Sequence, residues 1–331
     1  MVKLSYWIVF SKDKKMIKQN SFLELAHYRK LRCEKFLDEM ELVVPWKDMM
    51  SVIKPYYVAK DNGRPRFDLL LMLKIYCLQQ WYNLSDPGAE ENIYDRNSFQ
   101  KFLDIDLIAH QVPDETTILN FRHLLEEYDL PKQFFALINQ KLIDQGLIVK
   151  EGTSVDATII KAPSSTKNKN KKRDPEMSST KKGNQYFFGM KAHIGGDSEQ
   201  GLVHTLQTTT AKVHDKEMMN TLLHGEEKAI FADKGYFDDK MKKQYRIQDK
   251  YWGVLDKGKR NHPLSCSQKK RNHKLSTIRS KIEFPFGVIK CLWRYVKVRY
   301  RGLHKNTMQL FSLFALSNLY RARKKLLALS I

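Results

Sequence analysis

The chain has 331 residues, a formal net charge of +21 and a hydrophobic fraction of 42%. This length exceeds what one hydrophobic core usually serves, so two domains are expected. There is no run of about 18 apolar residues and no basic leader before an apolar segment, which favours a soluble, cytoplasmic protein without a membrane partner. The four cysteines form no C-x-x-C pair, so neither a disulfide framework nor a zinc site is expected.

The positive charge is confined to one half of the chain. Residues 1–150 contain 21 Lys and Arg against 21 Asp and Glu, whereas residues 151–331 contain 37 against 16. The positive charges of this half repel one another unless a polyanion lies near them, and nucleic acid is the commonest polyanion. The alternatives are a solvated basic surface or a ribosome-like RNA binder. An anionic membrane is disfavoured, because no amphipathic apolar face accompanies the charges.

The neutral half is predicted to be helical. Residues 67–82 (FDLLLMLKIYCLQQWY) are apolar enough for a buried helix, with Pro65 before them and a Ser-Asp-Pro-Gly break after them. Residues 113–117 (PDETT) then open a segment, ILNFRHLLEEY, whose apolar residues fall on one face. Short helices joined by turns fit a helix-turn-helix-like DNA-binding module and a plain helical bundle equally well.

From about residue 150 the pattern changes to alternating, β-branched runs. Strands are predicted at 153–160, 186–197, 202–211, 229–233 and 251–255, and helices at 215–224, at 238–247 and from about Thr277 onward. A polar, basic loop at 161–182 is expected to be disordered without DNA. The order β-β-β-α-β-α-β-α predicts a mixed sheet flanked by helices, the order of a ribonuclease-H-like fold. We therefore expect a helical domain at 1–148 and a ribonuclease-H-like α+β or α/β domain at 149–331.

Three acids occupy unusual positions. Asp156 lies in the middle of the first predicted strand, and Asp233 ends the fourth, at the edge where open α/β sheets tend to place their sites. Glu283 is the single carboxylate among 11 Lys and 8 Arg in residues 257–331. In this strand order the three could converge on one edge of the sheet. The alternative is that Glu283 pairs with Arg279 at the surface, while the two aspartates cap turns or helices.

Convergence of three carboxylates would require a cation. Two like charges about 4 Å apart repel by about 4 kcal/mol at an effective dielectric constant near 20. Two Mg²⁺ or Mn²⁺ ions would neutralise this charge and activate a nucleophile for phosphoryl transfer. Ligands that are all oxygen favour these metals over Zn²⁺.

The chain resembles the DDE transposases of bacterial insertion sequences, most closely the insertion-sequence-five group. The stretches that carry the resemblance are LQQWYNLSDPGAEENIYD (78–95), VPDETTILNFRHLLE (112–126), VDATII (155–160), FFGMKAHIG (187–195), ADKGY (232–236), RSKIEFPFGVIK (279–290) and VRYRGLHKN (298–306). The resemblance implies that Asp156, Asp233 and Glu283 form the catalytic, metal-binding triad. It also implies that the helical domain helps to bind the element's terminal inverted repeats, and that the reaction is DNA strand cleavage and transfer into target DNA by a synaptic homodimer at the bacterial nucleoid.

Related transposases carry a Tyr, Arg, Glu, Lys signature on the last helix. Arg279, Glu283 and Lys290 match it, but Ser276 stands at the tyrosine position, and Pro285 is expected to kink the helix. Arg279 and Lys290 are expected to grip phosphates beside the scissile bond. Further DNA contacts are expected at these positions: Lys191, Trp252, Arg299, Arg301 and Lys305. Trp252 could stack on a base drawn out of the duplex or belong to the core.

Two rival functions share these features. A general Mg²⁺-dependent nuclease would use the same acids, and only strand-transfer products would separate it from a transposase. A host-adopted or inactive DNA-binding copy would be expected to have lost one acid, and this chain has all three.

Overall fold

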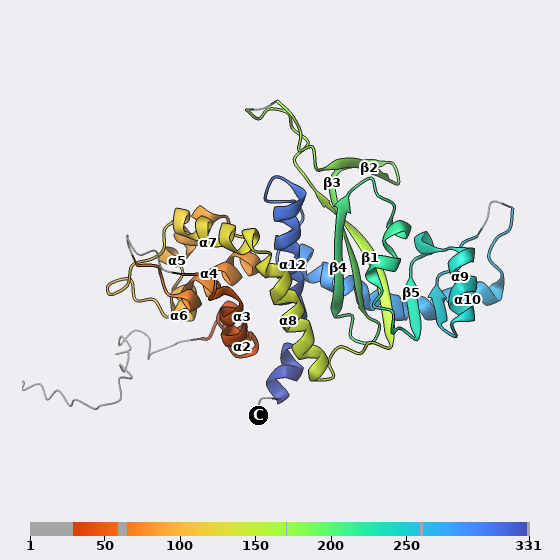
Figure 1. Ribbon diagram of the computed structural model, residues 1–331, viewed down its shortest axis with the longest axis horizontal. Coiled ribbons are helices and arrows are strands. Elements are labelled where there is room, and N and C mark those ends of the chain that lie inside the picture. Colours follow the sequence, from red (N-terminus) through yellow and green to blue (C-terminus); the bar gives the residue numbers. More distant parts are fainter. Residues whose placement is uncertain (1–28, 59–64, 170, 259–260, 330–331) are drawn as a thin grey trace, which may run out of the picture.

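The computed structural model describes residues 29–58, 65–169, 171–258 and 261–329. A bundle of short helices lies on one side of the molecule and a sheet on the other (Figure 1). Within the described ranges, no helix is both long enough and apolar enough to cross a membrane.

The first half forms short helices, and side-chain caps fix the starts of three of them, α4, α5 and α7. Asp68 accepts a hydrogen bond from Leu71 N (3.0 Å), Ser85 accepts one from Gly88 N (3.1 Å), and Asp114 accepts one from Thr117 N (2.6 Å). Such caps satisfy backbone donors that a helix leaves free at its first turn. The helices are α2 (Arg32–Val43), α3 (Trp46–Ile53), α4 (Leu69–Tyr82), α5 (Asp86–Asp95), α6 (Asn97–Leu103), α7 (Glu115–Glu127) and α8 (Leu130–Asp144).

The second half contains a six-stranded mixed sheet. Its strands are β1 (Gly152–Lys161), β2 (Ser178–Lys182), β3 (Gln185–Asp197), β4 (Val203–Thr210), β5 (Ala229–Ala232) and β6 (Tyr251–Val254). β2 and β4 pair antiparallel with successive parts of β3, β3 pairs antiparallel with β1, and β1, β5 and β6 run parallel. The spatial order β4-β3-β1-β5-β6 is that of a ribonuclease-H-like sheet, as the sequence predicted.

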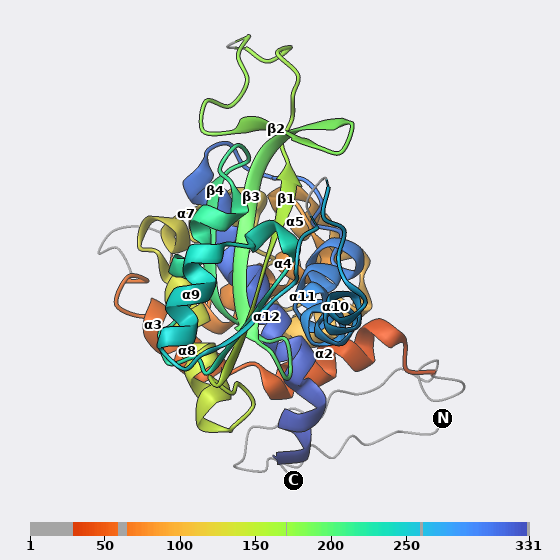
Figure 2. The same ribbon diagram turned by 90° about the vertical axis from the view of Figure 1, so that its right-hand side faces the viewer.

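The two faces of the sheet bury different cores. Val155 of β1 belongs to a small cluster with Ile230, Trp252 and Tyr236, against which Met241 of α9 (Asp239–Ile247) packs. Alternate residues of β1 point the other way, so Ile160 belongs to the large cluster that includes residues of both halves of the chain. Figure 2 shows α9 on one side of the strands, and α10 (Cys266–Arg279) and α11 (Glu283–Gly287) on the other.

The last helix, α12 (Leu303–Leu329), joins the two halves. It packs against α8, α2 and α4 on one side and β4 on the other, and lies between the bundle and the sheet in Figure 1. Asn318 of α12 accepts a hydrogen bond from Val203 N (2.9 Å) and donates to Val203 O (2.7 Å) and to Asn139 Oδ1 of α8 (2.8 Å). This buried set of bonds, completed by Asn139 Nδ2 to Val203 O (3.1 Å), ties α8, α12 and β4 together.

Three segments differ from the sequence prediction. Residues 215–224, expected as a helix, form only two 3₁₀ turns, η1 (Asp215–Met218) and η2 (Asn220–Leu222). Ser178–Lys182, expected within the loop 161–182, forms edge strand β2 because its backbone pairs with β3. The last helical region begins not near Thr277 but at Cys266, where Ser265 and Gln268 form a capping box.

Candidate functional site

Asp156 and Asp233 lie at neighbouring positions on parallel strands. In the β1–β5 register Val155 is paired with Ala232, and each aspartate is the next residue along its chain. Asp233 keeps an extended backbone (φ −70°, ψ 163°) just beyond the end of β5. Because neighbouring strands are about 4.8 Å apart, both carboxylates start from adjacent points on the sheet.

Asp156 is held in a confined, negatively charged environment. Its Oδ1 accepts a hydrogen bond from Ala157 N (2.8 Å), and its side chain keeps 20% of its exposure. Burial raises the pKa of this carboxyl to about 6; the Ala157 N–H and Arg279 counteract the rise, and Glu283 and Asp233 add to it. Asp156 is therefore close enough to both Glu283 and Asp233 for their charges to raise its pKa.

Glu283 reaches this edge on a segment that lies unusually close to the sheet. The 3₁₀ turn η4 (Ser280–Ile282) leads into α11, and Ile282 is fully buried. A Cβ at Gly196 of β3 would lie 2.4 Å from Ile282 Cδ1, and one at Gly201 would lie 2.3 Å from the Lys281 carbonyl oxygen. The two glycines therefore permit the close approach that brings Glu283 toward Asp156.

Arg279 links the first and third acids. Its Nη2 is 2.6 Å from Glu283 Oε1, and its Nη1 is 3.7 Å from Asp156 Oδ2. The surface pair that the sequence left open as an alternative is thus present, but the same guanidinium also faces Asp156. The Glu283 side chain is 51% exposed.

Lys290 binds β1 two residues beyond Asp156. Its Nζ donates to Thr158 Oγ1 (2.6 Å) and to the Ile159 carbonyl (2.7 Å), from the π-helical turn η5 (Val288–Leu292). Burial, with a smaller effect from Lys182 and Lys161, lowers its pKa to about 8. Pro285 lies in α11, between the 3₁₀ turn η4 and the π-helical turn η5, so the helix type changes on both sides of it.

The other expected DNA contacts lie in different environments. The Lys191 ammonium is buried and binds Asp215 Oδ1 (2.9 Å) and the Val213 carbonyl (2.7 Å), which argues against a DNA contact. Arg299 Nη2 donates to Asn83 O (2.5 Å) and Oδ1 (2.7 Å), and so joins the sheet half to the end of α4. Arg301 and Lys305 are exposed, and their contact with DNA stays a prediction.

Trp252 belongs to the core. It is 5% exposed, and the centroid of its ring lies 5.5 Å from that of Tyr245. Of the two alternatives, this burial favours a core residue over one that stacks on a base. The sequence did not single out Tyr236, which is buried with a hydroxyl that has no hydrogen-bond partner among the described residues. Burial raises the pKa of Tyr236, as do Asp215, Asp156 and Asp233. Its place in the ADKGY stretch, three residues after Asp233, was the available signal.

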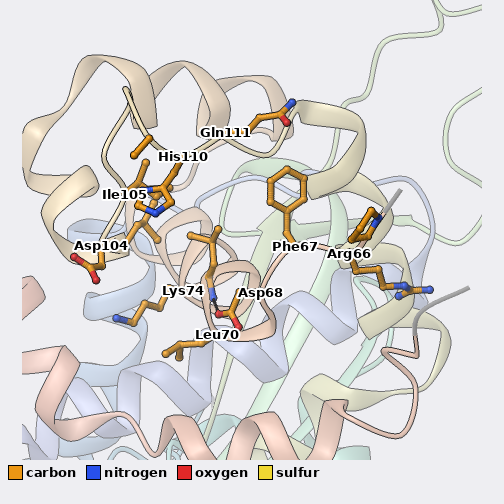
Figure 3. Close-up of a pocket in the computed structure, with 13 residues that line it drawn as sticks. Arg66, Phe67, Asp68, Leu70, Lys74, Asp104, Ile105, His110 and Gln111 are labelled. Carbon is orange, nitrogen blue, oxygen red and sulfur yellow. Dashed lines mark hydrogen bonds between the residues drawn. The ribbon is translucent and has the colours of Figure 1, made fainter. Parts of the chain in front are cut away.

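A separate hollow lies in the helical half. It has a volume of about 680 Å³ and is lined by residues that include Arg66, Asp68, Lys74 and His110 (Figure 3). None of the three acids lines it. In the described part of the chain, no three His, Cys, Asp or Glu side chains are gathered closely enough to hold a metal ion as they stand.

The chain is similar to known transposases. A family model described as "Transposase DDE domain" matches residues 148–319, and one described as "Transposase domain (DUF772)" matches residues 25–124. A solved structure entitled "Cryo-EM structure of piggyBac transposase synaptic complex with hairpin DNA (SNHP)" is similar with a TM-score of 0.48 and 8% sequence identity, over 94% of this chain and 78% of that one. Because the first model spans more than half of its residues, the chain belongs to the DDE transposase family, whose members are DNA-binding, divalent-metal-dependent enzymes that cleave and transfer DNA strands.

Proposed function

We propose that Asp156, Asp233 and Glu283 are the catalytic carboxylates of this transposase and that they bind Mg²⁺ or Mn²⁺, two ions in all. The observation that carries the proposal is the pairing of β1 with β5, which sets Asp156 beside Asp233, together with the Arg279 guanidinium that faces both Asp156 and Glu283.

The donor chemistry fits the metal. All three side chains supply oxygen, which Mg²⁺ and Mn²⁺ prefer. The raised pKa of Asp156 reflects burial and two neighbouring acids, so a cation at this point would relieve repulsion. Divalent ions bound here would lower the pKa of the attacking hydroxyl and stabilise the leaving oxygen of an in-line displacement.

The protein's own residues prepare the site for DNA. The Ala157 N–H fixes the orientation of the Asp156 carboxylate. Lys290, held against β1, adds positive charge at the same edge. The basic second half as a whole supplies the charge that duplex DNA requires.

The biological setting is part of the proposal. The substrate ends are the terminal inverted repeats of a bacterial insertion sequence of the insertion-sequence-five group, recognised in part by the helical domain at 1–148. Domain 149–331 carries the chemistry, and a homodimer in the cytoplasm, at the nucleoid, brings both ends to the target DNA. The family match and the stretches that carry the resemblance support this reading.

Glu283→Gln tests the triad. The change keeps the size of the side chain and removes one ligand charge, so cleavage of a labelled element end in Mg²⁺ should fall on the order of a thousandfold or more, because residues that act as a unit are lost together. DNA affinity, measured on the same preparation, should be kept or rise slightly. Glu226→Gln is the matched control, since this glutamate is exposed and pairs only with Lys150 among the described residues. A Glu283→Gln protein that cleaves like the parent would remove Glu283 from the site.

The nuclease alternative is separated by the products. A transposase joins the element's 3′ end to target DNA, whereas a general nuclease releases cut ends only. Incubation of the cleaved element end with supercoiled plasmid and Mg²⁺, followed by sequencing of joined products, distinguishes the two.

A further inference from the structure

The Arg279 guanidinium occupies the space between two of the proposed metal ligands. It contacts Glu283 Oε1 at 2.6 Å and faces Asp156 Oδ2 at 3.7 Å. The arginine and aspartate side chains are each 20% exposed, so the guanidinium is enclosed rather than free at the surface. Its Nε is buried without a hydrogen-bond partner in the described part of the chain. The guanidinium thus neutralises both acids without a full set of hydrogen bonds of its own.

The two halves of the acid cluster differ in this respect. Asp233 makes no ion pair with Arg279 among the described contacts, and it lies directly beside Asp156 in the strand register. A metal ion bound between Asp156 and Asp233 would therefore not have to displace the Arg279 guanidinium. An ion bound by Asp156 and Glu283 together would have to lie close to both carboxylates, about 2.1 Å from each oxygen for Mg²⁺, where the guanidinium now lies.

We infer that Arg279 is a positioning residue that holds the place of one metal ion: its guanidinium bridges Asp156 and Glu283 before metal binds, and it must swing away when an ion takes those two carboxylates. The inference rests on the proposed metal-binding role of the acids. It assigns to Arg279 an action before DNA arrives, in addition to the phosphate contact expected from the sequence.

Competition between the guanidinium and the ion has a measurable consequence. Removing the guanidinium frees both carboxylates, so the ion that they share should bind more tightly, by roughly three- to tenfold, the range that corresponds to breaking a partly exposed ion pair. The ion between Asp156 and Asp233 should change much less. Without metal, the same variant should be less stable than the parent, because Asp156 and Glu283 lose their shared counter-charge.

The test is calorimetric titration of the full-length chain with Mn²⁺, for the parent, Arg279→Gln and Lys274→Gln. Lys274 is the matched control, because it is an exposed cation on the same helix, α10. We expect the weaker Mn²⁺ step to tighten in Arg279→Gln and to stay within twofold of the parent in Lys274→Gln. The melting temperature of Arg279→Gln should be lower than that of the parent in EDTA, and this gap should narrow in excess Mn²⁺.

Two outcomes would overturn the inference in different ways. In the first, the parent binds Mn²⁺ and Asp156→Asn weakens this binding, but Arg279→Gln binds Mn²⁺ no more tightly than Lys274→Gln does. The place-holding role of Arg279 then fails and the proposed function stands. If the parent binds no Mn²⁺ that Asp156→Asn or Glu283→Gln weakens, the metal-binding function fails and the inference fails with it. Should Arg279→Gln not fold, Arg279→Lys serves instead, because a lysine ammonium is a compact charge without the rigid planar fork by which the guanidinium reaches two separated carboxylates; its weaker Mn²⁺ step should then also tighten.

Discussion

Two polar clusters lie on the same face of the sheet, and they are built in opposite ways. At the junction of α8, α12 and β4, Asn318, Asn139 and the Val203 backbone satisfy one another with neutral hydrogen bonds. At the edge of β1, Asp156 retains a raised pKa, and Arg279 leaves its Nε unpaired. Buried polar groups are normally satisfied, so the complete cluster has a structural role, and the incomplete one is consistent with the metal-binding role proposed above.

The complete cluster should be the more costly one to break. Asn318→Ala would leave the buried Val203 N–H, Val203 O and Asn139 Oδ1 without this partner, and a destabilisation of about 3 kcal/mol is expected, since each buried unsatisfied group costs about 1–3 kcal/mol. Urea denaturation measures the change. The control is Ser317→Ala at the neighbouring buried position, whose Oγ has no hydrogen-bond partner among the described residues. Equal losses for both variants would mean that the hydrogen bonds contribute little.

The second effect concerns the glycine that lets Glu283 approach. Gly201 has φ +66°, and a Cβ there would lie 2.3 Å from the Lys281 carbonyl oxygen. Gly201→Ala should cost about 2 kcal/mol, of which about 1 kcal/mol is the left-handed backbone penalty, and it should lower cleavage by moving the Glu283 segment. Gly183→Ala separates the two causes, because Gly183 has φ +61° with nothing within 4 Å of an added Cβ. Cleavage that is equally reduced in both variants would show that the contact with Lys281 is irrelevant.

The smallest effect should come from the incomplete cluster, and it should have the opposite sign. The folded pKa of Asp156 is about 6, above its ordinary value of 3.8, so the folded state binds more protons than the unfolded state between these values. Stability therefore falls as pH rises from about 4 to 6 and stays level above that range. Asp156→Asn should remove this loss.

The rise in the pKa of Asp156 from 3.8 to about 6 corresponds to at most about 3 kcal/mol, and solvent screening of a side chain that is 20% exposed reduces this value. In EDTA, Asp156→Asn should therefore be more stable than the parent by on the order of 1–2 kcal/mol at pH 7, and the difference should disappear near pH 4. Denaturation curves at several pH values measure it. A variant that is less stable than the parent at pH 7 would show that the pairing of Asp156 with Arg279 outweighs its burial.

Sequence reasoning recovered β1, β3 and β4, because β1 and β4 are rich in the β-branched residues that favour strands. In β3, Met190–Ile194 alternates apolar and polar residues, as a strand does. This reasoning missed β2, since SSTKK has no such pattern and becomes a strand only by pairing with β3. It placed the last helical region too late although the Ser265 and Gln268 capping box was legible in the sequence. Asp215–Leu222 contains good helix formers, yet Asp215 is engaged by Lys191 of β3 and the segment closes into 3₁₀ turns.

For the site, strand order was enough to predict that Asp156 and Asp233 are neighbours. It could not predict that one guanidinium faces both Asp156 and Glu283, because helical spacing alone gives the Arg279–Glu283 pair and says nothing of the distance to β1. The burial of Lys191 and Trp252 was likewise set by tertiary packing that a single sequence does not display.

The position of α12 has a consequence for where DNA would be cut. This helix is buried between the bundle and the sheet and is hydrogen-bonded to both. It therefore holds the two halves of the chain in a fixed arrangement. If the bundle grips an element end, the distance from that grip to Asp156 is set by the thickness of one helix and its neighbours. The number of base pairs between the recognised sequence and the scissile phosphate would then be fixed by the fold.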